Sequence, residues 1–175
     1  MEFTTSRFAA QTVRKTAELG WRPMQFLASP SNSVETVLRP AGLENANGIF
    51  TSQFTKQAAD PAWANDPEVI EYIAFMKRWA PSDNPTDFVA LSGDIPAQAI
   101  ADGLQRCGVE LTRDNIVKQA SSFRGQRFKM MLPGIELNNS ANDYAAYRSL
   151  RIARFDGTSW VLVDKPETSG QALYK

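Results

Sequence analysis

Apolar and polar residues along the first third of the chain alternate between helical and extended spacing. The pattern predicts a helix over residues 6–19 and a short buried strand over 24–28. A second, shorter helix is expected over 34–38, stopping before Pro40. A second strand is expected over 48–53. Helix, strand, helix and strand at this spacing predict α/β layering with parallel strands.

Three further helices are predicted in the middle of the chain. Asp66-Pro67 is an N-cap followed by a proline at the first helical position, and Pro81 ends that helix. A second helix is predicted over 95–107, with Gly108 at its C-terminal stop. A third is predicted over 112–121, with its first residue as the cap.

Each predicted helix also has an apolar face that the periodicity assigns to the core. These faces are interpreted as the stripes that pack against the rest of the protein. The residues expected to point inward are Phe8, Val13 and Ala17, then Val69, Ile70, Ile73 and Met76, and finally Ile100 and Leu104.

The end of the chain changes from helical to hairpin spacing. Apolar and basic residues alternate over 150–155, Asp156-Gly157 is a turn signal, and an apolar run returns over 160–163. The tail, residues 167–175, is expected to be loose. The expected fold class is therefore α/β, with parallel strands and a C-terminal antiparallel hairpin.

Composition narrows the class of protein. The chain has 175 residues, 43% of them hydrophobic and 22% charged, which is typical of a folded globular protein with one domain or two small lobes. Nineteen basic residues balance nineteen acidic ones, so a nucleic-acid binder, which would carry a basic excess, is not favoured.

The residue types that carry most enzyme and metal chemistry are scarce. The chain has no histidine, and Cys107 is its single cysteine. This excludes histidine-based triads and zinc sites built on Cys and His ligands, so we expect no catalytic residues, no metal and no cofactor, and the chain is not expected to be an enzyme. Cys107 is interpreted as a buried small hydrophobe rather than a reactive thiol. No apolar run is long enough to span a membrane, and the first residues lack the layout of a secretory signal.

Several segments, in order and across nearly the whole chain, resemble the branched-chain amino-acid branch of the type I periplasmic solute-binding proteins of ABC transporters. Their order and spacing carry the resemblance, since no single segment is diagnostic. The segments are Phe8-Ala9-Ala10-Gln11, Glu18-Leu19-Gly20-Trp21-Arg22-Pro23, Gln25-Phe26-Leu27, Val37-Leu38-Arg39-Pro40-Ala41-Gly42-Leu43, Asp60-Pro61-Ala62-Trp63 with Asp66-Pro67, Gln105-Arg106-Cys107-Gly108, Leu111-Thr112-Arg113-Asp114-Asn115, Leu132-Pro133-Gly134-Ile135 and Arg154-Phe155-Asp156-Gly157-Thr158-Ser159-Trp160-Val161-Leu162.

The resemblance implies two α/β lobes that close on a ligand held between them. It covers only the later, C-terminal portion of the family's chain. By analogy, residues 1–47 belong to the second lobe and 48–135 to a crossover and the first lobe. Residues 136–166 then return to the second lobe with the terminal hairpin, before the tail 167–175.

In function, the resemblance implies a periplasmic solute-binding component that delivers a small amino acid or an aromatic acid to an ABC permease. The alternative is a truncated, self-associating domain that has lost solute binding. Because part of the family's chain is not represented, strand edges and apolar stripes are expected to lack their neighbours, so a homodimer is predicted.

Two places are expected to touch the ligand. The resemblance places second-lobe contacts in the loop that holds Ser29, Ser31, Asn32 and Ser33, although small polar residues are equally normal in a loop that leads to a helix.

The second place is Asp94, where relatives commonly have an aromatic residue. Asp94 followed by Ile95-Pro96 is either the N-cap of a helix start or a partner for a ligand ammonium. The family's cleft implies that Asp94 faces the same groove as the serine-rich loop. Trp63 and Trp79 are candidates to stack on an aromatic ligand, but packing in the core or at the hinge is favoured for both.

Overall fold

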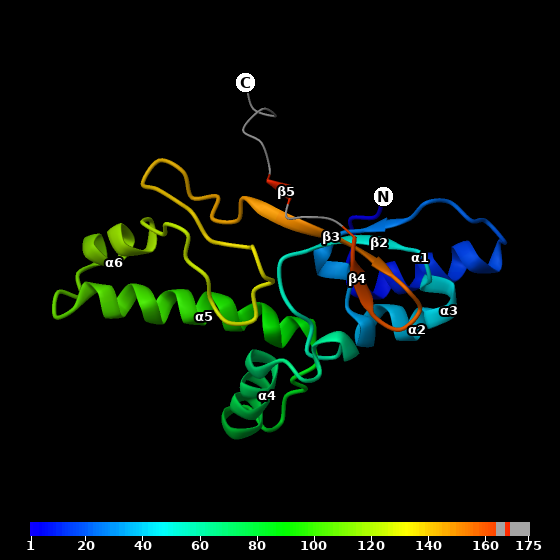
Figure 1. The fold of residues 1–175 in the computed structure, drawn as a ribbon, viewed down its shortest axis with the longest axis horizontal. Coiled ribbons are helices and arrows are strands. Elements are labelled where there is room, and N and C mark those ends of the chain that lie inside the picture. Colours follow the sequence, from blue (N-terminus) through cyan, green and yellow to red (C-terminus); the bar gives the residue numbers. More distant parts are fainter. Residues whose placement is uncertain (164–166, 169–175) are drawn as a thin grey trace.

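The computed structural model describes residues 1–163 and 167–168. The chain forms two parts that lie side by side (Figure 1). One part is a sheet with the helices of the first fifty residues, and the other is built from the three helices of the middle of the chain and a long irregular segment. Figure 1 shows the chain crossing between the two parts twice, after β2 (Phe50–Gln53) and before β3 (Ser149–Phe155).

The sheet has the strand order β1-β2-β3-β4, where β1 is Phe26–Leu27 and β4 is Trp160–Leu162. Strands β1 and β2 are parallel, whereas β2–β3 and β3–β4 are antiparallel. A further short strand, β5 (Glu167–Thr168), pairs with the start of β3. The expected fold class, α/β with parallel strands and a C-terminal antiparallel hairpin, is confirmed.

The turn of the terminal hairpin is held by one aspartate. The Asp156 carboxylate accepts hydrogen bonds from the backbone N–H groups of Thr158 and Ser159, both at 2.8 Å. These bonds, that from Ser159 first, lower the pKa of Asp156. Gly157 has φ 99°, a conformation that disfavours side chains with a Cβ. The predicted hairpin is confirmed because its turn chemistry is local.

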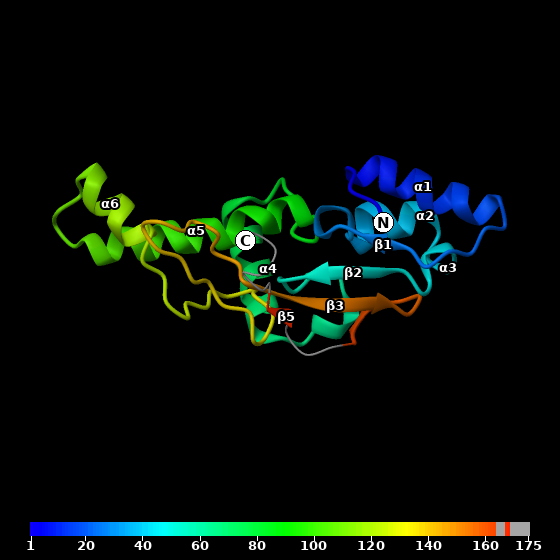
Figure 2. The ribbon, with the colours of Figure 1, turned by 90° about the horizontal axis from the view of Figure 1, so that it is seen from above.

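Helix α1 (Ser6–Glu18) lies with α2 (Arg39–Ala41) over one face of the sheet (Figure 2). Its buried residues are small: Ala9, Ala10, Val13 and Thr16. The prediction that Phe8 points inward is wrong, since Phe8 is exposed. The face of α1 that packs against the helical turns after β1 is the one that carries these short side chains.

The serine-rich loop leads into two consecutive helical turns. A 3-10 turn over Ser29–Ser31 precedes the π-helix η2 (Val34–Leu38), whose N-cap is Ser33, as expected. The predicted stop before Pro40 is wrong, because the chain continues directly into α2. Proline is tolerated in the first turn of a helix, since the N–H groups of that turn have no acceptor within the helix. Helix α3 (Leu43–Ala46) then leads into β2. The first strand is also shorter than expected, since Met24 is exposed.

The second part begins with a 3-10 turn, η3 (Pro61–Trp63), and α4 (Pro67–Trp79). Asp66 is the N-cap of α4 and accepts hydrogen bonds from the N–H groups of Glu68 (3.0 Å) and Val69 (3.3 Å), as predicted. The buried stripe is partly different from the one expected: Tyr72 is buried, and Ile70 is exposed.

Helix α5 runs from Phe88 to Cys107, and α6 (Arg113–Ala120) follows with Thr112 as the predicted cap. The expected start of α5 at residue 95 is wrong, because Asp87 is the N-cap and Pro96 lies inside the helix. The proline removes one helical hydrogen bond, to the Ser92 carbonyl, on an exposed side where water can replace it.

The inward face of α5 is also not the one that periodicity suggested. Leu91, Ile95, Gly103 and Cys107 are buried, whereas Ile100 and Leu104 are exposed. The interpretation of Cys107 as a buried small residue is confirmed.

The buried apolar residues form three clusters. One belongs to the sheet part and two to the helical part; the largest members are Leu27, Leu38, Phe155 and Trp160 in the first, Phe123, Phe128 and Leu132 in the second, and Tyr72, Met76 and Met130 in the third. The assignment of residues 1–47 and 136–166 to one lobe, and of 48–135 to the other, stays a prediction. Of the tail expected to be loose, only Glu167–Thr168 is described, and it forms β5; the rest lies outside the described residues. Within the described ranges, no helix combines the length and the apolar character needed to cross a membrane.

Candidate functional site

The parallel strands β1 and β2 end side by side. Ser29 follows the end of β1, and Ser52 is the second-last residue of β2. The Ser29 hydroxyl donates to the Ser52 carbonyl at 2.6 Å, and the two hydroxyl oxygens lie 3.1 Å apart. Both residues are half-buried. Ligands of α/β proteins bind at the carboxyl ends of parallel strands, so this edge is the first candidate site.

Gln53, the last residue of β2, has an unusual environment at the same edge. Gln53 is only 5% exposed, and its side-chain Nε2 has no hydrogen-bond partner among the described residues. A buried donor without an acceptor is destabilising by about 1–3 kcal/mol, so this amide is a group that a ligand oxygen would satisfy.

The other three residues predicted in the loop lie beneath the surface. Ser31 donates to the Thr4 carbonyl, and Ser33 accepts from the Thr36 N–H at 3.2 Å. Asn32 donates to the Thr51 hydroxyl at 3.2 Å. All three are almost fully buried, and their polar groups hold the loop in place.

Asn32 is also the centre of a network that joins three distant segments. The Gln57 amide donates to the Asn32 side-chain oxygen at 2.9 Å, and the Trp160 indole N–H donates to the Asn32 carbonyl at 2.9 Å. The Trp160 backbone N–H in turn donates to Asp60 at 2.9 Å. Burial raises the pKa of Asp60, and the bond from Trp160 opposes that rise. The loop, the crossover after β2 and the terminal hairpin are thereby locked together.

Asp94 lies in the second turn of α5, so the interpretation of this residue as an N-cap is wrong. It lines a cavity of about 490 Å³ between α4 and α5. Its carboxylate accepts from the Gln98 amide at 2.7 Å. Burial raises the pKa of Asp94, and the bond from Gln98 acts in the opposite direction.

Tyr72, from α4, lines the same cavity and is only 4% exposed. Its hydroxyl is buried and has no hydrogen-bond partner in the described part of the chain. Burial first, and then the negative charges of Asp94 and Asp87, raise its pKa to about 12. The residues that line the cavity therefore include a half-buried carboxylate and a tyrosine whose buried hydroxyl is unsatisfied in the described part of the chain.

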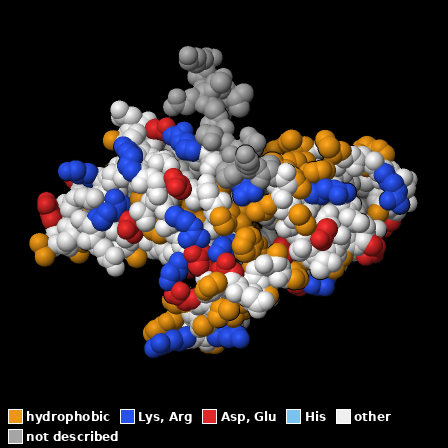
Figure 3. Space-filling model, viewed as in Figure 1, with side chains coloured by type: hydrophobic (Ala, Val, Ile, Leu, Met, Phe, Trp, Pro, Cys, Tyr) orange, Lys and Arg blue, Asp and Glu red, His pale blue; other side chains and the backbone are white. Residues whose placement is uncertain are grey.

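An ion-pair cluster lies beside this cavity, at the start of α4, where acidic and basic side chains gather in Figure 3. The Lys56 ammonium, 4% exposed, lies 2.7 Å from Asp66 and 2.9 Å from Glu68. Arg127 contacts both oxygens of Glu68, at 2.7 and 2.9 Å. The Arg127 bonds first, then Lys56 and the Met130 N–H, hold the pKa of Glu68 at about 2 against the effect of burial.

These charges tie together three segments far apart in sequence: the crossover after β2, α4 and the loop before residue 131. Every carboxylate of the cluster is paired, and the described residues contain no group of three or more His, Cys, Asp or Glu side chains arranged to hold a metal ion. The cluster therefore stabilises the fold of the second part.

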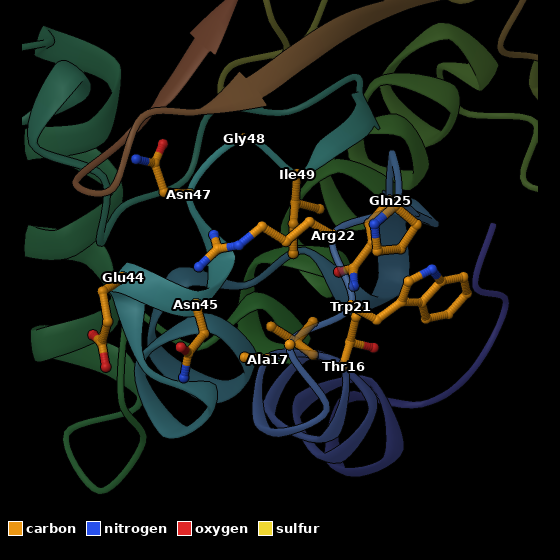
Figure 4. Close-up of a pocket in the computed structure, with 13 residues that line it drawn as sticks. Thr16, Ala17, Trp21, Arg22, Gln25, Glu44, Asn45, Asn47, Gly48 and Ile49 are labelled. Carbon is orange, nitrogen blue, oxygen red and sulfur yellow. The ribbon is translucent and has the colours of Figure 1, made fainter.

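A third pocket, of about 470 Å³, lies at the amino ends of β1 and β2, the edge opposite Ser29 and Ser52. It is formed by the end of α1, the loop to β1 and the turn before β2 (Figure 4). Figure 4 shows the Arg22 guanidinium extending toward the side of the pocket that carries Asn45 and Asn47. The pocket is polar, but it lies at the strand edge where ligands of α/β sheets are not usually found.

The structure does not bring the two predicted ligand-contact regions into one cavity. None of residues 29–33 lines the cavity that Asp94 lines. Trp63 packs against both helical cores, with the Lys56 ammonium 5.3 Å from its ring centre. Trp79 is exposed, under the Arg78 guanidinium.

Sequence reasoning missed Ser52, Gln53 and Tyr72. The position of the first two was recoverable, because both end the second of two predicted parallel strands and such ends meet at one edge of the sheet. Tyr72 was hidden because Ile70 and Ile73 were taken as the stripe of α4, although Tyr72 lies one turn before Met76 on the face that packs.

Comparison with known proteins identifies a family. A family model described as "Periplasmic binding protein" matches residues 1–159, so the resemblance that the sequence motifs indicate is confirmed. No curated protein matches the chain.

Several solved structures share the fold. A branched chain amino acid ABC transporter protein from Thermus thermophilus with bound valine superposes with a TM-score of 0.80 at 15% identity, covering 98% of this chain and 46% of that chain. A possible leucine/isoleucine/valine-binding protein from Rhodopirellula baltica has a TM-score of 0.67 at 21% identity, covering 91% and 41%. A fatty acid ABC transporter substrate-binding protein from Thermomonospora curvata has a TM-score of 0.65 at 18% identity, covering 98% and 43%. The chain thus spans less than half the length of each of these proteins.

Proposed function

The chain belongs to the periplasmic binding protein family, and on this basis we propose that it is a solute-binding component of an ABC importer. It acts in the periplasm by binding rather than by catalysis, and it delivers its solute to a membrane permease. The solute is a small amino acid or an aromatic acid.

The observation that carries this proposal is the unpaired Gln53 amide at the carboxyl ends of β1 and β2. It lies next in sequence to Ser52, whose hydroxyl is 3.1 Å from that of Ser29. Consecutive strand residues point to opposite faces of the sheet, so the Gln53 amide and the two serine hydroxyls lie on opposite faces at the same strand ends. Amide N–H and hydroxyl groups are donors that suit a carboxylate oxygen. Ser31, Asn32 and Ser33 support this edge from below through their internal hydrogen bonds.

The ligands named for two of the solved relatives are compatible with a carboxylate. The Thermus thermophilus protein holds valine, and the Thermomonospora curvata protein is described as a fatty acid transporter component. Valine and a fatty acid share a carboxylate attached to an apolar body. We therefore propose that the carboxyl ends of β1 and β2 bind the carboxylate of the solute. The apolar body of the solute would then determine which acid is bound.

Calorimetric titration of the full chain with valine, leucine, phenylalanine, benzoate and 4-hydroxybenzoate tests the proposal. We expect saturable binding of at least one acid. Gln53→Leu should weaken that binding about tenfold or more, as loss of a charge-assisted hydrogen bond does.

The control is Gln11→Leu, the same substitution at an exposed position of α1, which should leave affinity unchanged. Because the Gln53 Nε2 has no hydrogen-bond partner in the described part of the chain, its removal should not lower the melting temperature. If none of the five acids binds, or if Gln53→Leu binds as well as the parent chain, the solute site is not at this edge.

A second candidate function is self-association, and a specific observation favours it. Val89, Ile100 and Leu104 expose an apolar stripe along α5. Exposed stripes of this kind are relieved by pairing with a second chain, and burial of apolar area contributes about 25 cal/mol per Å². We propose a homodimer through this face. Light scattering at micromolar concentration should give twice the chain mass, and Ile100→Glu should halve it; a monomeric parent chain would refute the dimer.

A further inference from the structure

We propose that the cavity between α4 and α5 is a separate binding site for an organic amine, a ligand with an ammonium group on an apolar body. The site is distinct from the solute edge, because Ser29, Ser52 and Gln53 do not line it. Its volume, about 490 Å³, lies within the usual range of small-molecule sites.

The charge of the cavity selects a cation. Three carboxylates line it, those of Glu68, Glu71 and Asp94. Glu68 is paired with Lys56 and Arg127, and Glu71 lies 2.6 Å from Lys129, the cavity's one basic lining residue.

Asp94 alone among the three has no ion-pair partner in the described part of the chain. One of its oxygens accepts from Gln98, which is neutral. Burial is the larger effect on the pKa of Asp94 and raises it; the positive charge of Lys129 also acts on Asp94 and lowers its pKa, but the Lys129 ammonium is paired with Glu71. A ligand ammonium would compensate this half-buried carboxylate directly.

Tyr72 is the second, independent observation. Tyr72 lines the cavity, and its buried hydroxyl has no hydrogen-bond partner among the described residues, although buried hydroxyls are nearly always paired. A tyrosine hydroxyl can accept a hydrogen bond as well as donate one. An ammonium group has three donors, so it can serve Asp94 and Tyr72 together.

The walls fit an apolar body. Phe75 and Met76 project from α4, and the side of α5 that faces them is made of small residues, Ala90, Gly93 and Ala97. Phe75 is exposed and presents a ring against which a cation or an aromatic group can pack. A Cβ built at Gly93 would meet no atom within 4 Å, so the groove is open at this point.

The test uses benzylammonium as the probe and benzyl alcohol as its uncharged counterpart, titrated into the full chain by calorimetry. Asp94→Asn removes the charge and keeps a side chain that can still bond Gln98. Gly93→Leu fills the groove at a helical position with open space around it, where leucine is a better helix former than glycine, so the fold should persist. Asp83→Asn, which removes an exposed charge of the same part of the molecule, is the matched control.

We expect benzylammonium to bind at least about tenfold more tightly than benzyl alcohol, and both Asp94→Asn and Gly93→Leu to weaken it about tenfold or more, with Asp83→Asn within about twofold. The affinity for benzyl alcohol should not change in Asp94→Asn. Absence of saturable benzylammonium binding below about 10 mM would overturn the proposal, as would equal binding by the Asp94→Asn variant. The homodimer proposed above would use the same face of α5, because Gly93 lies two helical turns before Ile100, so the dimer and the amine site exclude each other. A dimer that Gly93→Leu converts to a monomer, measured by light scattering, would therefore overturn the amine site, because the groove would then hold a second copy of the chain.

Discussion

Replacement of Glu68 by glutamine tests whether the ion-pair cluster stabilises the helical part. Glu68 is the residue that joins Lys56, Arg127 and the Met130 N–H in one contact set. Glutamine has the same shape and retains an oxygen that can accept from Met130, so Glu68→Gln removes chiefly the charge.

The magnitude follows from the pKa of Glu68, which the Arg127 bonds, followed by Lys56, lower from 4.5 to about 2. At a pH above both pKa values, a difference of this size corresponds to at most about 3 kcal/mol of stabilisation. The side chain is 23% exposed, so solvent screening reduces the effect, and we expect a loss of about 1–2 kcal/mol in the free energy of unfolding at pH 7.

The sign with pH is determined because the pKa is lower in the folded than in the unfolded protein. The stabilisation is fully present above pH 4.5 and is lost as the pH falls toward 2. The difference between the parent chain and Glu68→Gln should therefore shrink over this interval, since glutamine does not titrate.

Urea unfolding, followed by far-UV circular dichroism and by the fluorescence of tryptophan, measures both quantities. The matched control is Glu71→Gln, which breaks the pair with Lys129. Glu71 is 61% exposed, so this pair should contribute less than about 0.5 kcal/mol. If the two variants lose the same stability at pH 7, or if the Glu68→Gln difference persists near pH 2, the cluster does not act as described.

Four further predictions concern the fold. Leu27→Ala, at a fully buried strand position, should lower the free energy of unfolding by about 2–5 kcal/mol in urea. Asn32→Leu should lower the free energy of unfolding by about 1–3 kcal/mol, because the Gln57 amide loses its side-chain acceptor and the loop that presents the Asn32 carbonyl to Trp160 loses its support. An unchanged urea midpoint would contradict the network. Pro96→Ala should stabilise the protein by about 1–3 kcal/mol in thermal melts by restoring a helical hydrogen bond, and a decrease would mean that the packing of α5 needs the proline. The Cys107 thiol, buried in the fold, should react with a thiol reagent only after denaturant is added.

The features predicted correctly from the sequence depend on neighbouring residues. Asp66 and Thr112 cap the helices that follow them, and Asp156-Gly157 turns the hairpin, because the donor and acceptor in each case are only a few residues apart. The order of motifs also identified the family, since spacing along the chain is itself sequence information.

The features predicted wrongly depend on which neighbour a segment meets. Helix α5 carries apolar residues on more than one side, so periodicity alone could not tell that Leu91 and Ile95 pack inward while Ile100 stays exposed. Pro96 suggested a helix start, but Asp87 begins the helix and the remaining turns and tertiary packing tolerate the lost hydrogen bond.

The candidate sites divide in the same way. The family resemblance pointed to the loop that holds Ser29, and the small polar residues of that loop are compatible with a ligand contact but equally normal in a loop that leads to a helix. The sequence could not reveal that Asn32 forms hydrogen bonds with Gln57 and Trp160, because these residues lie 25 and 128 positions away along the chain. It could not reveal either that Asp94 and Tyr72 share a cavity, since they come from different helices.

By itself, then, the sequence determined the family, the α/β class, the helix caps and the terminal hairpin, all of which follow from short-range geometry and from the order of motifs. Only the tertiary structure decided which helix faces are buried, which polar groups are satisfied, and where an unpaired amide, hydroxyl or carboxylate is left. The physical reason is that burial and hydrogen-bond satisfaction are properties of contacts between distant segments, and a linear pattern does not specify those contacts.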